Sequence, residues 1–176
     1  IELFIRIDAK ETVADIVPLL DDADKYVRLK ALNALQKFNA VETAGKIAPV
    51  LNDKYFFVRS TAVETIETFG IKDMAGLIVP LLKDFDNNVR INALKCLGTL
   101  GATEFTDDIM PLLNDKNPGV RAFAGIALVE LGAKDRVPET SIGDIKAVLE
   151  WKNDEYKSRA QKALDELSGP NRHLPE

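Results

Sequence analysis

The sequence predicts an all-α fold, an α-solenoid (α-α superhelix) of helix pairs with about 31 residues per repeat. Three observations predict it. A Val-Arg pair recurs every 31 residues, the apolar residues around each pair follow helical spacing, and a Gly or Asn follows each longer apolar stretch. Positions that recur at a fixed period of this length are typical of an array in which every unit packs on its neighbours.

The recurring positions align over four units. The arginines that follow a valine are Arg28, Arg59, Arg90 and Arg121. An aspartate stands six residues before each of them, at Asp22, Asp53, Asp84 and Asp115. In the third unit, the apolar residues Val89, Ala93, Leu97 and Leu100 have the spacing of one face of a helix. Each unit therefore predicts a shorter first helix and a longer second helix.

The expected helix ends carry suitable residues. The second helices should end at Asn39, Gly70, Gly101 and Gly132, because Gly and then Asn adopt left-handed backbone at the lowest cost. Acidic residues follow three positions later, where a carboxylate favours a helix start: Glu42, Asp73, Glu104 and Asp135. Prolines fall inside the first helices, at Pro18, Pro49, Pro80 and Pro111. We expect a kink there in every unit, because the proline ring crowds the carbonyl four residues back.

A single array is expected over residues 1–168, with a half repeat at 1–8, four repeats over 9–132 and a divergent C-terminal repeat over 133–168. Residues 169–176 are expected to form a loose tail. Because residues 1–7 match the end of a second helix, we expect the chain to be a fragment that an additional N-terminal region of the same protein precedes. The last unit comes 36 residues after the fourth and puts Trp151 in the aspartate position, which is typical of a terminal cap.

Composition excludes several classes of protein. The net charge is −5 and the pI about 5.1, so we do not expect a nucleic acid partner, which usually requires a basic balance or stripe. A single cysteine forms no internal disulfide and no multi-cysteine metal site. No apolar run approaches the roughly 20 residues of a membrane helix. We therefore expect no membrane segment and a cytoplasmic location.

Catalytic residues are not expected either. Cys96 should be a small buried residue, because the same position in other units holds Ala34, Thr65 and Ala127. A cysteine nucleophile needs a nearby histidine, and the single histidine, His173, falls in the tail. We accordingly predict a non-enzyme with no catalytic residues, no metal site and no cofactor.

The aspartate and arginine positions are expected to form a structural ladder, with pairs within and between units. A guanidinium group can bind a carboxylate and nearby loop carbonyls at once. The alternative, a phosphate-binding row of arginines, is less favoured because an acidic partner recurs in register with each arginine.

The variable positions of the second helices should face the concave surface and are the candidate partner contacts. One group of them is aromatic, and consists of Tyr26, Tyr55, Phe56 and Phe57. The other is Phe123 with Ile126, where other units are largely polar. Exposed aromatics on a concave surface are candidate anchors for a partner. The alternatives are packing between units for the aromatic group, and burial beneath the irregular C-terminal insert for Phe123 and Ile126.

The unit IVPLLKDFDNNVRINALKCLGTLG closely resembles a short HEAT repeat, also called the phycobilisome-lyase-like HEAT repeat. The shared elements are Pro-Leu-Leu, the aspartate, the Val-Arg pair, the alanine and the closing Leu-Gly. The resemblance implies a superhelix whose second helices line the concave side, and a scaffold or binding function.

The favoured function is a non-catalytic scaffold module that binds a protein or peptide ligand on its concave face. One alternative is a bilin lyase or isomerase subunit of the phycobilisome-lyase type. A second is a nucleic-acid-binding HEAT-like protein. That alternative would need a basic stripe, but the variable positions mix basic with acidic residues: Lys30, Lys37 and Lys95 with Glu64, Glu67 and Glu130.

Overall fold

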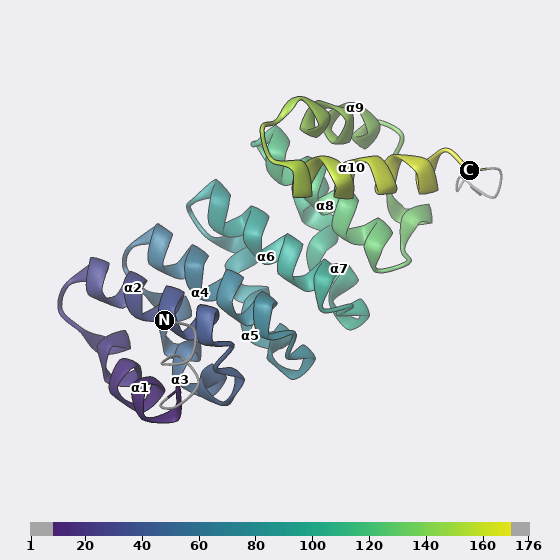
Figure 1. Ribbon diagram of the computed structural model, residues 1–176. Coiled ribbons are helices and arrows are strands. Elements are labelled where there is room, and N and C mark those ends of the chain that lie inside the picture. Colours follow the sequence, from purple (N-terminus) through teal and green to yellow (C-terminus); the bar gives the residue numbers. More distant parts are fainter. Residues whose placement is uncertain (1–8, 170–176) are drawn as a thin grey trace.

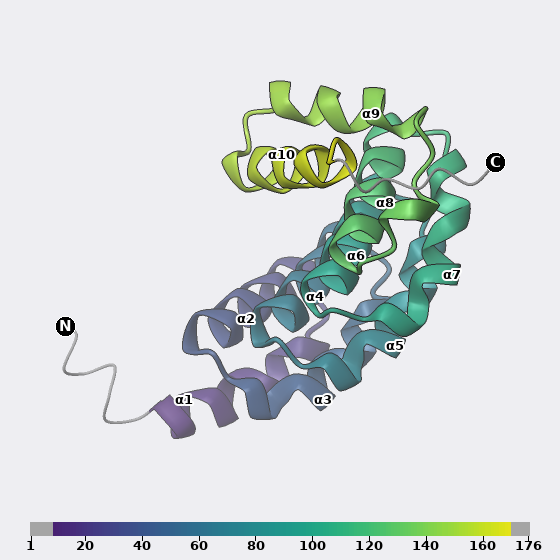
Figure 2. The ribbon, with the colours of Figure 1, turned by 90° about the vertical axis from the view of Figure 1, so that its right-hand side faces the viewer.

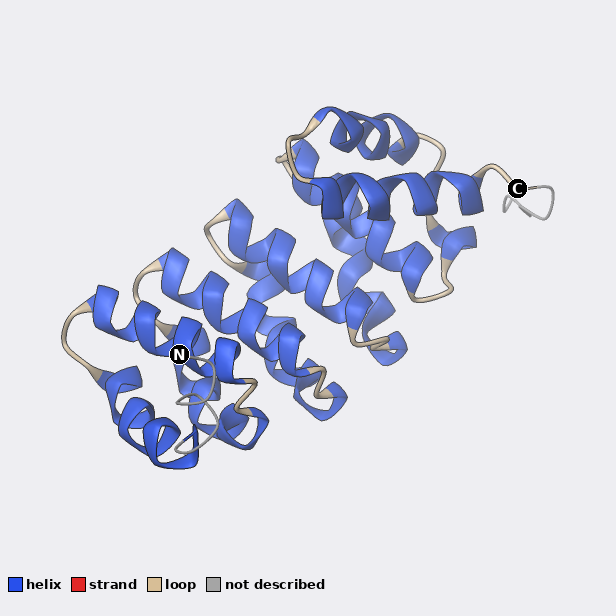
Figure 3. Ribbon diagram, in the orientation of Figure 1, coloured by secondary structure: helices blue, strands red, loops and turns tan. Residues whose placement is uncertain are grey.

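The structure is a computed structural model that describes residues 9–169. Within this range all regular elements are helices, arranged in successive pairs (Figures 1 and 3). The predicted all-α solenoid is therefore confirmed. The half repeat predicted over residues 1–8, and the tail from residue 170 onward, lie outside the described residues.

The first helix of each repeat is a short α-helix that continues as a 3-10 helix. These composite helices are α1 (Ala9–Ile16) with η2 (Val17–Asp21), α3 (Ala44–Ile47) with η4 (Ala48–Asn52), α5 (Ala75–Ile78) with η6 (Val79–Lys83), and α7 (Thr106–Ile109) with η8 (Met110–Asn114). The recurring proline lies at the start of each 3-10 part. Because proline has no N–H to donate, the α-helical ladder stops there and a tighter turn follows. A switch from α-helix to 3-10 helix therefore marks the place where a kink was predicted.

The second helices are longer and unbroken. They are α2 (Lys25–Phe38), α4 (Phe56–Phe69), α6 (Asn87–Thr99) and α8 (Pro118–Glu130). The residues predicted to end them have left-handed φ angles of 49° at Asn39, 66° at Gly70, 62° at Gly101 and 77° at Gly132. Single 3-10 turns follow: η3 (Val41–Thr43), η5 (Lys72–Met74), η7 (Thr103–Phe105) and η9 (Lys134–Arg136). Each has the predicted acidic residue in its first turn.

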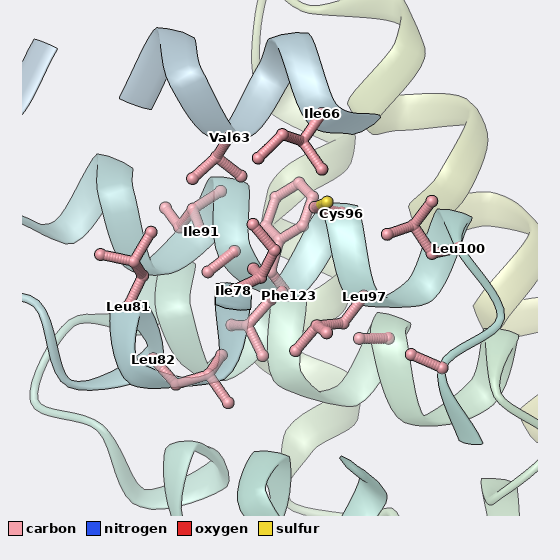
Figure 4. Close-up of a cluster of buried hydrophobic side chains, with 14 of the residues drawn as sticks. Val63, Ile66, Ile78, Leu81, Leu82, Ile91, Cys96, Leu97, Leu100 and Phe123 are labelled. Atoms are coloured by element: carbon pink, nitrogen blue, oxygen red, sulfur yellow. The ribbon is translucent and has the colours of Figure 1, made fainter. Parts of the chain in front are cut away.

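The helices form two rows with the core between them. Figure 2 shows α2, α4, α6 and α8 along the inner side of the curve and α3, α5 and α7 along the outer side. Apolar side chains from adjacent repeats meet between the rows, among them the fully buried Ile66, Ile78 and Leu97 (Figure 4). Cys96 is part of this core, as predicted, and has no exposed surface.

The last helix pair departs from the regular stacking. It consists of α9 (Ser141–Ala147), η10 (Val148–Glu150) and α10 (Asp154–Leu167). Helix α9 lies along α8, and α10 extends across the inner side of the curve (Figure 2). From α10, the Arg159 guanidinium donates to the carbonyl of Lys95 at 3.1 Å and to Thr99 Oγ1 at 3.0 Å, both on α6. The divergent repeat therefore covers one end of the concave surface.

Two glycines provide room for this cover. A Cβ atom on Gly119 would lie 2.9 Å from the Trp151 ring, and one on Gly98 would collide with the Glu130 carboxylate that binds Arg159. Other units carry side chains at both positions. A regular repeat at this end would therefore exclude α10 from the place that it occupies.

Candidate functional site

The arginine ladder joins neighbouring repeats. In each of four repeats the arginine side chain donates to the aspartate side chain of the next repeat, at 2.5 Å for Arg28 and Asp53 and at 2.6 Å for Arg59 and Asp84. Each arginine also donates to the carbonyl of the aspartate in its own repeat, as Arg59 does to Asp53 at 2.7 Å. The side-chain pairs thus lie between units, while the contacts within a unit are to backbone.

The ends of the ladder differ from its middle. Asp22 accepts from the backbone N–H of Asp24 at 2.7 Å and has no arginine side-chain partner within residues 9–169. At the other end, the sequence places Trp151 in the aspartate position, but Arg121 pairs with Asp144 on α9 at 2.7 Å. Asp144 was not identified from the period, because the extra residues of the last repeat shift it out of register.

The ladder carboxyls have perturbed acidity. Burial raises the pKa of Asp53, but the hydrogen bonds from Arg28 and from the Tyr55 backbone N–H outweigh burial and hold that pKa below its ordinary value. The same balance lowers the pKa of Asp84, with Arg59 as the opposing partner. Both carboxyls are therefore ionised and bound, so these arginines are not free to form a phosphate-binding row.

The four aromatic residues Tyr26, Tyr55, Phe56 and Phe57 form one group, here called the aromatic cluster, at the start of α2 and α4. The Phe57 ring lies 6.0 Å from Tyr26, 5.7 Å from Tyr55 and 5.6 Å from Phe56. Tyr26 is 57% exposed and Phe56 44%, whereas Tyr55 and Phe57 are half-buried. The cluster thus combines packing between repeats with an exposed aromatic surface.

Phe123 and Ile126 are not available to a partner. Both side chains are fully buried, so their assignment as partner contacts is wrong for this structure. The Phe123 ring lies 4.8 Å from Tyr156 and 6.1 Å from Trp151, which belong to the C-terminal repeat. Burial was the alternative expectation, but the rings that cover Phe123 belong to Trp151 and Tyr156, which follow the irregular insert in the sequence rather than forming part of it.

The rest of the concave surface is polar and interconnected. Glu67 on α4 lies 3.3 Å from Lys95 Nζ and 3.6 Å from Arg159, which also pairs with Glu130 at 2.5 Å. Burial raises the pKa of Glu130 although Arg159 acts in the opposite direction. For Lys95, burial lowers the pKa, but Glu67 and Glu155 outweigh it, so that the net shift is upward. This ion-pair network anchors α10 to α4, α6 and α8.

Two pockets on the concave surface share Tyr156 as a lining residue. The first has a volume of about 510 Å³ and is lined by Gln36, Glu64, Glu67, Thr68, Lys95, Thr99, Asn153, Glu155 and Tyr156. The second, here called the asparagine pocket, has a volume of about 530 Å³. It is lined by Ser60, Glu64, Asn87, Asn88, Ile91, Asn92, Asn117, Pro118, Gly119, Trp151 and Tyr156. Glu64 and Tyr156 belong to both pockets.

The concave groove is defined by these two pockets and the aromatic cluster. Phe57 and Glu64 lie on one face of α4, seven residues apart, so the cluster and the pockets follow each other along that helix. Sequence reasoning placed Glu64 on the concave surface but did not identify a pocket, because Trp151 and Tyr156 come from outside the regular repeats. Trp151, at the position that holds aspartate in the other four repeats, was the available signal.

Phe85 is a second residue that the period did not single out. It lies in the loop between η6 and α6 and is 99% exposed. Among the described residues, no group of three His, Cys, Asp or Glu side chains is placed to bind a metal ion. No helix in residues 9–169 is long and apolar enough to cross a membrane.

Comparisons with known proteins agree with this architecture. A family model described as HEAT repeats matches residues 74–168. The complex of CpcE and CpcF of phycocyanin lyase from Nostoc sp. PCC7120 is 20% identical with a TM-score of 0.65, over 94% of this chain and 79% of that chain. A search among curated proteins finds no match.

Designed proteins are also similar. A designed armadillo repeat protein is 21% identical with a TM-score of 0.55, over 89% of this chain and 82% of that chain. Another, in complex with the peptide (KR)4, is 20% identical with a TM-score of 0.52, over 89% and 82% of the two chains. At these identities the similarity shows the fold alone.

Proposed function

The chain belongs to the HEAT-repeat family, and from this we propose that it is a non-catalytic module that binds a protein segment or peptide in its concave groove. The observation that carries the proposal is the groove itself. Two polar pockets of about 510 and 530 Å³ lie in one line with exposed aromatic side chains. Pockets of this size, with a few polar groups and aromatic walls, are typical of binding sites.

The rest of the chain supports a binding function rather than a catalytic one. The ladder arginines are bound to carboxylates of the neighbouring repeat, and Cys96 is buried in the core. Burial raises the pKa of the Cys96 thiol far above its ordinary value, so the thiolate that a nucleophile requires is disfavoured. In the groove, the side chain of Asn88 is exposed and lines a pocket.

The partner is expected to be an extended segment with a basic character. Among the groove residues that pair with one another or line the pockets are four carboxylates, Glu64, Glu67, Glu130 and Glu155, against the two basic groups Lys95 and Arg159. This surplus is confined to the pockets, because Lys25 and Lys54 lie 4.4 Å and 5.1 Å from the Tyr55 ring of the aromatic cluster, and it favours a cationic group at the pocket end of a bound segment. The structurally similar designed armadillo repeat protein in complex with the peptide (KR)4 is a precedent for a basic peptide on this architecture.

Panning a random peptide library against the chain tests the proposal. We expect enriched peptides that bind the wild-type protein and lose binding to Asn88→Arg, which places a long basic side chain at the mouth of the asparagine pocket. The matched control is Asn114→Arg, because Asn114 is equally exposed but ends η8 in the outer row. Failure to enrich any peptide, or equal binding to both variants, would contradict groove binding.

The phycocyanin lyase similarity does not lead to a second proposal. It shows a shared helix arrangement at 20% identity. A bilin bound to the purified chain, seen as visible absorbance, would replace the present proposal.

A further inference from the structure

We propose that the asparagine pocket is a recognition site for an arginine side chain of the bound segment. This inference rests on the proposed groove binding and names the chemistry that one pocket selects.

Glu64 supplies the charge. It is the only ionisable acid or base among the pocket residues apart from the tyrosine. One carboxylate oxygen, Oε1, accepts a hydrogen bond from Asn92 Nδ2 at 2.6 Å, and the same amide donates to Ser60 Oγ at 2.7 Å. Within residues 9–169, no lysine or arginine forms an ion pair with Glu64. Asn92 therefore fixes the orientation of a carboxylate whose charge has no basic partner.

The neighbouring cations are already bound elsewhere. Lys95 pairs with Glu67 at 3.3 Å and with Glu155 at 3.1 Å, and Arg159 pairs with Glu130. Lys95 lines the other pocket and is absent from the lining of the asparagine pocket. A cation that enters the asparagine pocket would thus meet one uncompensated carboxylate.

Trp151 and Tyr156 form the aromatic wall. Their ring centroids are 6.1 Å apart, and both rings also contact Phe123, which holds them in place. Trp151 rests against Gly119, where a larger residue would displace it. Aromatic faces attract cations, and tryptophan does so most strongly. Lys95 Nζ, from a residue that lines the other pocket, already lies 5.6 Å from the centroid of the Tyr156 ring.

The combination favours a guanidinium group over an ammonium group. A guanidinium is planar, so it can stack on an indole while its N–H groups point in the plane toward a carboxylate. The pocket offers both partners at once, in Trp151 and Glu64. The Asn88 side chain is exposed at the pocket and forms no hydrogen bond within the described residues, so it can bind the backbone of the segment.

The experiment uses small probes and the single tryptophan of the chain. N-acetyl-L-arginine amide is titrated into the full chain while the Trp151 indole N–H signal is followed by NMR. N-acetyl-L-citrulline amide is the matched probe, because it has the same shape without the charge, and N-acetyl-L-lysine amide is the second comparison. We expect a saturable shift with the arginine probe, weaker binding of the lysine probe and no saturable shift with citrulline.

Two variants complete the test. Glu64→Gln keeps the oxygen that accepts from Asn92, so the protein should fold, and it should bind the arginine probe about tenfold more weakly. Glu104→Gln is the control, because Glu104 is exposed on the outer row. Equal binding of citrulline and arginine, binding of lysine as tight as that of arginine, or an unchanged affinity in Glu64→Gln would overturn the assignment.

The outcome is separable from that of the proposed function. Suppose that the selected peptides lose binding to Asn88→Arg, but bind the wild-type protein equally well when citrulline replaces their arginine. That result would support groove binding and overturn the arginine pocket. A Trp151 response to the arginine probe without any enriched peptide would support the pocket and contradict peptide binding.

Discussion

Arg90 on α6 connects two repeats through a single side chain: its Nη2 donates to Asp115 of the next repeat at 2.9 Å while its Nη1 donates to the Asp84 carbonyl at 2.7 Å. The side chain is only 6% exposed. Removing it would leave the Asp115 carboxylate without its basic partner, with only the Asn117 backbone N–H as a donor to Oδ1, and would remove the arginine donor from the Asp84 carbonyl at a junction between repeats.

Replacing Arg90 with alanine should therefore destabilise the array. Breaking a buried ion pair by removing one partner costs about 3–5 kcal/mol, so we expect a loss of that order in the free energy of unfolding, measured by urea denaturation. Arg121→Ala is the comparison, because the Arg121 side chain is 29% exposed and should matter less. An unchanged melting temperature in Arg90→Ala would contradict a structural ladder.

The same ladder should make stability depend on pH in the acid range. The pKa values of Asp53 and Asp84 are lower in the folded protein than in the unfolded chain. Their contribution is therefore present above the unfolded value, near 4, and is lost as the pH falls through the folded values. We expect the free energy of unfolding to fall steeply below about pH 4. Asp84→Asn should have a lower free energy of unfolding than wild type at pH 7, and the difference between the two proteins should become smaller as the pH decreases. A constant deficit would contradict this origin.

Local chemistry explains why so much of the fold could be predicted from the sequence. In every repeat, a residue with a left-handed backbone conformation ends the second helix, and a proline interrupts the first helix. Both effects depend only on the residue itself and its near neighbours in the chain. The path of α10 could not be predicted in this way. Nothing in the sequence near Gly98 and Gly119 shows that these positions must lack a side chain; the reason is the close packing of the C-terminal part of the chain, which only the structure shows. Asp144 was missed for a related reason, since a partner outside the period depends on three-dimensional approach.

The candidate site could be predicted only in part. The period indicated which positions face the concave side, and Glu64 and the aromatic cluster were among them. It could not distinguish an exposed variable position from a covered one, so Phe123 was assigned to a partner although the chain itself covers it. Burial by a non-repeating segment leaves no periodic signal.

Phe123→Ala should consequently act as a core substitution. The ring is fully buried and contacts Trp151 and Tyr156, so its loss opens a cavity beneath the C-terminal repeat. Truncating a buried phenylalanine costs about 3–5 kcal/mol. Urea denaturation measures the loss, and Trp151 fluorescence reports whether the C-terminal repeat detaches first. A variant as stable as wild type would show that this repeat is not packed as described.

Substitutions in the aromatic cluster should weaken peptide binding with little effect on the stability of the fold. Tyr26 is more than half exposed, so Tyr26→Ala is expected to weaken a peptide selected on the groove while the melting temperature stays unchanged. Phe57→Ala should also weaken binding, with a small loss of stability, because Phe57 is half-buried among three rings. Isothermal titration calorimetry and thermal melts measure the two effects. Equal affinity in both variants, or a large loss of stability in Phe57→Ala, would assign the cluster to packing alone.

Cys96 should be unreactive in the folded protein. Its side chain has no exposed surface, and burial raises the pKa of the thiol, so neither access nor the thiolate is available to a disulfide reagent. At pH 8 we expect labelling by a chromogenic disulfide to proceed only as fast as the third repeat opens, and to become rapid in denaturant. The Arg90→Ala variant should accelerate labelling, because Arg90 and Cys96 lie on the same helix and the broken ladder lowers the cost of opening. Rapid labelling of the native wild-type chain would contradict both the burial of the thiol and its role as a small packing residue.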